Sequence, residues 1–211
     1  MSTMQIVGRS SSHFTRLPRL FAEELSIAHE LVVVYDMTAL GPEAYGDNPA
    51  LKLPLLKRNG SVLFGAQNIC RALAEMSERR LAIVWPEDLR DDLSRNAQEL
   101  VWHCMQTQVQ LVMGTLVGKL PAENVYFSKA RAGMEHSLKW LDAHLADALN
   151  ALPRQRDLST FEASLFCLFD HLIFRQTIPA EPYGELANFA REFGQRESAQ
   201  TTAYRMDPPP Q

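Results

Sequence analysis

The spacing of hydrophobic positions changes along the chain, and residues 1–77 mix two periods. The apolar run Met4–Val7 and the β-branched run Leu31–Tyr35 predict short strands. Between them, a helix is predicted by apolar residues at helical spacing: Leu17, Leu20, Phe21 and Leu25. A strand, a helix and a second strand form a βαβ unit with parallel strands. We expect the run at 31–35 to be buried, because β-branched runs of this kind fill parallel sheets.

A hairpin and another helix follow in the same region. The segments Leu53–Lys57 and Val62–Phe64 predict two strands. Asn59-Gly60 between them indicates a type I′ turn, since both central residues of that turn need a positive φ. After Gly65, one face of a predicted helix carries apolar residues: Ile69, Ala72, Leu73 and Met76. Residues 1–77 are therefore predicted to form an α/β domain with the element order βαβ-ββα.

Strand patterns disappear after residues 78–88, which we interpret as a linker. Residues 89–204 are predicted to form an all-α domain, with helices near 88–117, 124–149, 159–174 and 183–193. Ser159-Thr-Phe-Glu162 is a capping box, in which the serine oxygen and the glutamate each satisfy N–H groups at the start of a helix. The proline-rich residues 205–211 are expected to be a frayed tail.

Composition narrows the classes of function. The net charge of −4, with mixed signs over 211 residues, gives no basic footprint for nucleic acid. No apolar run approaches the roughly 20 residues that span a bilayer, and no export signal is visible, so we expect a cytoplasmic protein without a membrane partner. The isolated cysteines Cys70, Cys104 and Cys167 indicate buried thiols in a reducing compartment. The isolated histidines His103 and His136 argue against a metal site.

Pro54 predicts a binding site made from main chain. A proline at the mouth of a strand cannot donate to the ladder, so it belongs at an edge, at a first position or in a cis turn. A cis Leu53–Pro54 bond would turn the Leu53 backbone outward. Its N–H and C=O would then be free to pair with an extended peptide.

These residues carry a resemblance to a known family. The order Asn48-Pro49, Lys52-Leu53-Pro54, Leu56, Gly60, Leu63 and Ile69 resembles the thioredoxin-like domain of the glutathione transferase superfamily. In that family a cis-proline loop pairs with the cysteinyl backbone of glutathione. The resemblance implies a thioredoxin-like α/β N-terminal domain followed by an all-α domain, glutathione as co-substrate, and a homodimer.

The segment Ser12-His-Phe-Thr-Arg-Leu-Pro-Arg19 resembles the S/C-P-F/Y-x-R-x-x-R segment of bacterial, zeta-like and omega-like members. The alignment makes Ser12 the thiol-facing catalytic residue, with Ser11 as the fallback and Phe14 among the glutathione-binding residues. A hydroxyl and a helix N-terminus both stabilise a thiolate. The alternative is that the serines only cap the first helix. Since no cysteine occupies this position, thiol–disulfide exchange is disfavoured.

One position departs from the family pattern. Members usually carry an acidic or amide residue followed by serine where this chain has Gly65-Ala66, and those side chains hold the γ-glutamyl group. The Ala66 N–H at a helix start can still meet a carboxylate, and Gln67 is a candidate substitute. Lys52 is a candidate partner for the glycyl carboxylate, or an ordinary solvated lysine.

Three functions stay open. The first is a transferase that adds glutathione thiolate to a small hydrophobic electrophile, with Trp102, His103 and Met105 lining the second-substrate pocket or, alternatively, packing in the core. The second is a non-catalytic module of the same fold that binds a protein or a peptide-like ligand, which Gly65-Ala66 favours. The third is an enzyme that uses a thiol cofactor without a γ-glutamyl head.

Overall fold

The structure is a computed structural model, and it describes residues 4–208 of the chain. The chain divides into two compact units. The first contains the residues up to Leu81 together with those from Gln195 onward, and the second is Ala82–Gly194. The two units are described one after the other.

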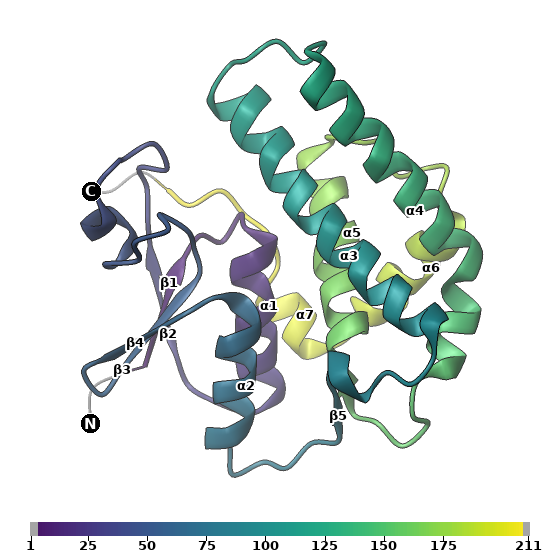
Figure 1. Cartoon of the computed structure of the whole chain (residues 1–211). Coiled ribbons are helices and arrows are strands. Elements are labelled where there is room, and N and C mark those ends of the chain that lie inside the picture. Colours follow the sequence, from purple (N-terminus) through teal and green to yellow (C-terminus); the bar gives the residue numbers. More distant parts are fainter. Residues whose placement is uncertain (1–3, 209–211) are drawn as a thin grey trace. The chain divides into compact units, whose positions relative to one another are not determined.

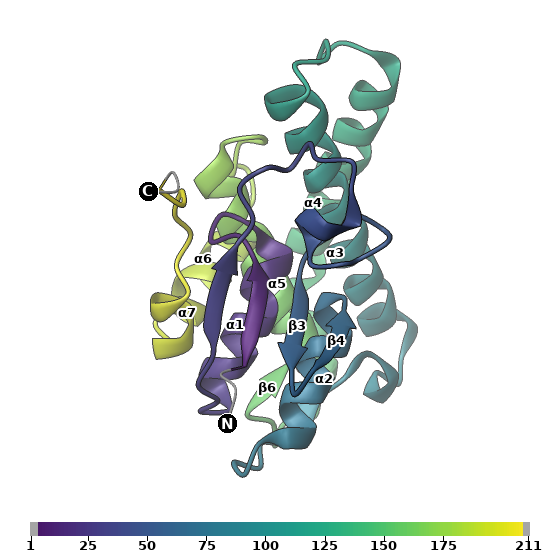
Figure 2. The ribbon, with the colours of Figure 1, turned by 90° about the vertical axis from the view of Figure 1, so that its left-hand side faces the viewer.

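The first unit is built on a four-stranded mixed sheet with the strand order β2-β1-β3-β4 (Figure 2). Strands β1 and β2 are parallel, and β3 pairs antiparallel with both β1 and β4. Asn59 and Gly60 have φ values of 46° and 75°, as the turn between β3 and β4 requires. The predicted βαβ-ββα order is confirmed, with strands β1 Gln5–Gly8, β2 Glu30–Val33, β3 Leu55–Arg58 and β4 Ser61–Phe64.

The prediction that the run at 31–35 is buried within the sheet is wrong. Strand β2 is an edge strand that pairs only with β1 among the described strands, and its residues are half-buried or exposed. Tyr35 is 41% exposed. β-branched residues suit any pleated surface that is half covered, so the composition of the run does not distinguish an edge from a centre.

Helices α1 (His13–Glu24) and α2 (Ala66–Met76) cover the same face of the sheet (Figures 1 and 2). The short 3₁₀ helix η1 (Pro42–Tyr45) lies between β2 and β3 along the chain. Fully buried apolar side chains from the sheet and these two helices form the core, among them Ile6, Leu17, Leu20, Phe21, Leu55, Leu56, Ile69 and Leu73.

The domain boundaries differ from the predicted ones at the C-terminal end. Residues from Gln195 onward, including the short helix α7 (Glu197–Thr201), belong to the first unit and not to the helical one. Within the predicted tail, the Asp207 side chain is 2% exposed, whereas Arg205, Met206 and Pro208 are exposed. The predicted fraying of 209–211 lies outside the described residues. The reason for the difference is the buried Arg16 of α1, which binds backbone and side-chain oxygens of the C-terminal segment.

The second unit is helical, as predicted, apart from one short strand pair. Strands β5 (Ile83–Val84) and β6 (Leu158–Ser159) form a two-residue parallel bridge that hydrophobic periodicity could not indicate. The other elements are the 3₁₀ helix η2 Pro86–Asp88, α3 Asp92–Leu111 with the π-helical extension η3 Val112–Val117, α4 Val125–Ala151, α5 Thr160–Arg175 and α6 Gly184–Phe193. None of the helices that the structure describes has the length and apolarity to cross a bilayer.

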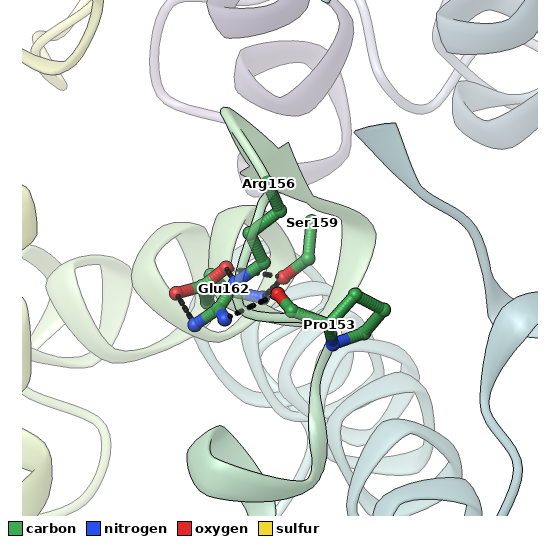
Figure 3. A network of polar contacts seen from close by, with 4 residues as sticks. All are labelled: Pro153, Arg156, Ser159 and Glu162. Carbon is green, nitrogen blue, oxygen red and sulfur yellow. Dashed lines mark hydrogen bonds and ion pairs between the residues drawn. The ribbon is translucent and has the colours of Figure 1, made fainter. Parts of the chain in front are cut away.

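The predicted capping box opens α5 (Figure 3). The Ser159 Oγ accepts a hydrogen bond from the Glu162 backbone N–H at 3.0 Å and donates to the Glu162 carboxylate at 2.6 Å. Arg156 adds a bidentate ion pair to that carboxylate, with two N···O distances of 2.8 Å. Arg156 also donates to the Pro153 carbonyl oxygen. The network fixes the start of the most apolar helix of this unit, since N-terminal N–H groups need acceptors.

Candidate functional site

Three loops of the first unit meet at one end of its sheet. The pairing of Val7 with Leu55 places the end of β1 beside the start of β3, and the pairing of Leu55 with Phe64 places the end of β4 there as well. The loop after β1 (residues 9–12, here called the serine loop), the Leu53–Pro54 loop before β3, and the start of α2 after β4 therefore lie at the same end of the sheet.

Ser12 is the N-cap residue of α1. Its Oγ accepts a hydrogen bond from the Thr15 backbone N–H at 3.3 Å, and its carbonyl oxygen accepts one from the Arg16 N–H at 2.9 Å. A serine hydroxyl has two lone pairs and one O–H group, so the capping bond leaves the O–H to donate elsewhere. Capping and thiol stabilisation, which are alternatives at the level of the sequence, are therefore compatible in one residue.

The three serines of this segment differ in exposure. Ser10 and Ser11 are 1% and 2% exposed, whereas Ser12 is half-buried. The Ser10 Oγ is buried and has no hydrogen-bond partner among residues 4–208. Ser12 is thus the hydroxyl that a ligand can reach. Phe14 is also half-buried, and its ring centroid lies 4.7 Å from that of His13.

Thr15 holds the serine loop against the end of β1. Its Oγ1 accepts a hydrogen bond from the Arg9 backbone N–H at 3.3 Å. A Cβ at Gly8 would clash with the Thr15 side chain, so glycine is required where the strand meets the helix. The Ser12 N–H donates to the Arg9 carbonyl oxygen at 3.2 Å, which closes the loop as a tight turn.

The Leu53–Pro54 peptide bond is cis. The loop before it is fixed by Asn48, a 5% exposed residue whose Nδ2 donates to the Lys52 carbonyl oxygen at 2.6 Å. The Asn48 Oδ1 accepts from the Ala50 N–H at 3.0 Å. Asn48 was named in the sequence only as part of the family resemblance. Its position before a proline-containing strand, together with the Asx-turn preference of asparagine, is the signal that could have found it.

The start of α2 offers main-chain groups and no side-chain acceptor. Gly65 is the N-cap with a φ of 89°, makes no side-chain capping bond, and its N–H donates to the Pro54 carbonyl oxygen at 3.2 Å. Ala66 is buried and Gln67 is exposed. The first N–H groups of the helix therefore receive no capping bond from the N-cap side chain, and N–H groups at a helix start suit an anion.

Arginine side chains gather along α1 behind the serine loop. Burial lowers the pKa of Arg19, the neighbouring Arg205 and Arg16 lower it further, and Glu23 and Asp207 act in the opposite direction. Arg9 belongs to the serine loop itself, and its Nη1 donates to the Tyr35 carbonyl oxygen at 3.0 Å. An excess of positive charge near a helix N-terminus favours an anionic ligand such as a thiolate.

The predicted second-substrate residues do not come together. Met105 is 0% exposed in the core, Trp102 is half-buried, and His103 alone of the three lines a cavity of about 460 Å³ between α3 and α4. His103 is offset by one position from Trp102 and by two from Met105, so it points in a different direction from the helix, whereas Trp102 and Met105 are three positions apart and lie on the more buried face. Burial raises the pKa of Cys104, which also lines the cavity, to about 12, so this thiol stays protonated.

A second cavity, of about 310 Å³, lies on the first unit, between the strands and η1. Val7, Val32, Tyr35, Glu43 and Lys57 are among its lining residues, and none of the predicted site residues is. Within residues 4–208, no cluster of three or more histidine, cysteine or carboxylate side chains could hold a metal ion.

Comparison with known proteins relates the first unit to a family model. Residues 11–76 match the family model of the glutathione S-transferase N-terminal domain. No curated protein sequence matches the chain significantly.

Solved structures share the fold over nearly the whole chain. A glutathione S-transferase of Methylobacillus flagellatus with glutathione bound has a TM-score of 0.75 at 22% identity, covering 96% of this chain and 100% of that one. One from Methylobacterium radiotolerans, in complex with glutathione sulfonate, has a TM-score of 0.74 at 16% identity, covering 100% and 99%. A Pseudomonas fluorescens family member with bound S-(propanoic acid)-glutathione has a TM-score of 0.71 at 19% identity, covering 96% and 100%. Residues 11–76 thus match the N-terminal domain model of the glutathione S-transferases, and the whole chain shares its fold with solved glutathione transferases.

Proposed function

We propose that this protein binds glutathione and adds its thiolate to a small hydrophobic electrophile. The observation that carries the proposal is the Ser12 hydroxyl, which caps α1 with a lone pair and keeps its O–H as a donor. A donor at a helix N-terminus, backed by arginines, lowers the pKa of a nearby thiol. Ser12 would therefore hold glutathione as the thiolate, the form that attacks an electrophile.

The loops beside Ser12 would bind the rest of the tripeptide. The Leu53 backbone N–H and C=O would pair with the cysteinyl residue, in the manner of an added strand. The exposed Lys52 would meet the glycyl carboxylate. The first N–H groups of α2, at Ala66 and Gln67, would take the γ-glutamyl carboxylate in place of the side chains that Gly65 and Ala66 lack.

The structural neighbours support this assignment of ligand. Three of them are described with glutathione, glutathione sulfonate or S-(propanoic acid)-glutathione bound. The last of these ligands is a conjugate of glutathione. By the family resemblance, we further propose that the protein acts as a cytoplasmic homodimer, which light scattering of the purified chain would test.

The first experiment is isothermal titration of glutathione into the wild type and a Ser12→Ala variant. We expect micromolar to low millimolar binding in the wild type, and a thiolate ultraviolet absorbance that the variant loses. Ser61→Ala is the matched control, since it removes an exposed hydroxyl from the β3–β4 turn of the same unit. No heat up to ~10 mM glutathione, which is weaker than about −3 kcal/mol of binding, would overturn the proposal.

A non-catalytic module is the second candidate, and the bare start of α2 favours it. Because Gly65 and Ala66 carry no polar side chains, a γ-glutamyl group loses the hydrogen bonds that such side chains would make. Peptide-like ligands without that group would still pair with the Leu53–Pro54 loop. Binding of such a ligand by a protein that fails to bind glutathione would favour this candidate. A different thiol cofactor would instead show a thiolate signal that depends on Ser12.

A further inference from the structure

We propose that Asp207 is a positioning residue for the serine loop, and that the C-terminal strap formed by residues 204–207 is part of the thiol site. The inference rests on the proposed function, because the serine loop matters as a site only if Ser12 meets a thiol. It adds a residue at the far end of the sequence to a site that otherwise comes from residues 9–67.

The contacts of Asp207 reach the serine loop directly. Its Oδ2 accepts a hydrogen bond from the Ser10 backbone N–H at 3.0 Å and lies 3.9 Å from the Arg9 Nε. The Asp207 side chain is 2% exposed, so the carboxylate is shielded from water. A hydrogen bond to an ionised acceptor is about twice as strong as one between neutral groups, and shielding strengthens it further.

The strap follows α7, and hydrogen bonds hold α7 and the residues around it against α1. The buried Arg16 donates from Nη2 to the Ala199 carbonyl oxygen at 2.9 Å and from Nε to the Thr202 Oγ1 at 3.4 Å. Its guanidinium carbon lies 4.2 Å from the centroid of the Tyr204 ring, within cation–π range. At the other end of α1, Glu24 accepts from Arg196 at 2.9 Å and from the Ser198 hydroxyl at 2.6 Å.

The serine loop is thereby held from both sides. Thr15 and the turn bond from Ser12 to Arg9 fix it from within α1 and β1, and Arg9 is tied to Tyr35. Asp207 adds a contact from outside this local set. Because Ser10 precedes Ser12 by two residues, the direction of the Ser10 N–H constrains the backbone that aims the Ser12 hydroxyl.

The arrangement also explains how a carboxylate can lie beside a site meant for a thiolate. An unpaired carboxylate there would repel the thiolate and raise its pKa. Asp207 instead faces Arg9, and around Arg19 the cations Arg16 and Arg205 outnumber the one further carboxylate, Glu23. The local charge therefore stays positive with the strap in place.

The test uses Asp207→Ala, the rescue variant Asp207→Asn, which keeps an acceptor oxygen, and the matched control Asp147→Ala, which removes a carboxylate from an exposed position of α4. Two readouts are compared: amide hydrogen exchange of the serine loop without glutathione, and the thiolate absorbance of bound glutathione. We expect Asp207→Ala to speed exchange at Ser10 and to lower the thiolate fraction, each by about tenfold. Asp207→Asn should fall between Asp207→Ala and the wild type, because it keeps an acceptor oxygen but loses the charge, and Asp147→Ala should change neither readout.

A purely structural clasp predicts a different result. Asp207→Ala would then lower the urea midpoint, while exchange at Ser10 and the thiolate fraction stayed at wild-type values, and the inference would be wrong. If Asp207→Ala fails to fold, Tyr204→Ala loosens the strap without removing the carboxylate, and it should speed exchange at Ser10 in the same direction. Unchanged exchange in that variant would also overturn the inference.

The two proposals fail in distinguishable ways. If the wild type does not bind glutathione, the proposed function is wrong, and the exchange readout still decides whether Asp207 positions the loop. If glutathione binds as a thiolate in every Asp207 variant, with unchanged exchange at Ser10, the proposed function stands and Asp207 has no positioning role.

Discussion

Two serines begin helices in this protein, and they use their hydroxyl groups differently. At the start of α5, Ser159 is 0% exposed; its Oγ accepts from the Glu162 N–H and donates to the Glu162 carboxylate (Figure 3). At the start of α1, Ser12 is half-buried and its Oγ accepts from the Thr15 N–H at 3.3 Å. The first hydroxyl has used its only proton, whereas the capping bond of the second has used only a lone pair.

This difference in the use of the hydroxyl proton distinguishes a cap that only stabilises a helix from a cap that can also bind a ligand. Both serines fit the preference for serine at an N-cap, so the local motif does not tell them apart. What tells them apart is the donor capacity left over and its access to a ligand. A carboxylate beside Ser159 consumes the proton, and Arg156 neutralises that carboxylate. The carboxylate of the C-terminal strap, Asp207, accepts a hydrogen bond from the Ser10 backbone N–H and not from Ser12.

The largest expected effect is the loss of the carboxylate at the structural cap. Glu162→Ala removes the acceptor of both the Ser159 hydroxyl and the Arg156 guanidinium, whose side chain is only 19% exposed. We expect a loss of about 2–3 kcal/mol in the free energy of unfolding, less than for a fully buried pair because the site is partly solvated. Urea denaturation measures it. Glu162→Gln is the control and should lose less, since it keeps an acceptor.

The next largest effect is expected for Ser159→Ala. It removes the cap of α5 and leaves the Glu162 carboxylate with one donor fewer, so we expect a loss of about 1.5 kcal/mol in the free energy of unfolding. The same denaturation experiment measures it. Catalysis should be unaffected in the folded variant, and a loss of transferase activity at full folding would contradict a purely structural role.

Ser12→Ala should have the opposite effect, with a small loss of stability and a large loss of activity. The capping bond is long and half-exposed, so we expect a loss of only about 0.5 kcal/mol in the free energy of unfolding. Under the proposed function, the loss in kcat/KM should be about 100-fold, because thiolate stabilisation is removed. Parallel denaturation and steady-state kinetics measure the two. A stability loss as large as that of Ser159→Ala, with activity retained, would break the comparison.

A third N-cap residue, Asp91 at the start of α3, is ionisable, so its contribution to stability should depend on pH while that of Ser12 should not. The Ser94 backbone N–H, 2.8 Å from Asp91 Oδ1, lowers the pKa of this carboxyl, and the Ser94 hydroxyl lowers it further. The folded pKa is therefore below the unfolded value of about 3.9, so the stabilisation is present above that pH and is lost as the pH falls through the folded pKa. We expect the stability difference between the wild type and Asp91→Asn, a few tenths of a kcal/mol at neutral pH, to shrink on acidification. Ser12→Ala has no titrating cap and should show a difference that does not change with pH.

Much of the fold could be predicted because it follows from local patterns. Asn59-Gly60 fixed the hairpin and its register, and the S-x-x-E pattern located the start of α5. The features that were predicted wrongly or not predicted at all concern which segments pack together across long stretches of sequence. The run at 31–35 lies at an edge, β5 pairs with β6 across 75 residues, and the C-terminal segment packs on α1. None of these pairings has a signal within a window of the sequence.

The candidate site divides in the same way. Residues next to a strand end or a helix start were proposed from their positions together with the family resemblance: Ser12, Leu53, Pro54 and Gly65. The second-substrate residues were proposed from composition along α3, and the structure sends Met105 into the core while His103 lines a cavity. Asn48 and Asp207 were missed as positioning residues because their effect lies in contacts to backbone atoms elsewhere.

The sequence by itself determined the element order, the turn between β3 and β4, the helix caps and the serine at the start of α1. These depend on residue preferences for φ, ψ and short-range hydrogen bonds, which act over a few residues. Only the tertiary structure decided which hydroxyl keeps a free proton and which carboxylate holds which loop. Those outcomes depend on side chains brought together across the chain, such as Asp207 and Ser10, 197 residues apart. Burial then sets their strength, since a hydrogen bond to a charged group gains most where water is excluded.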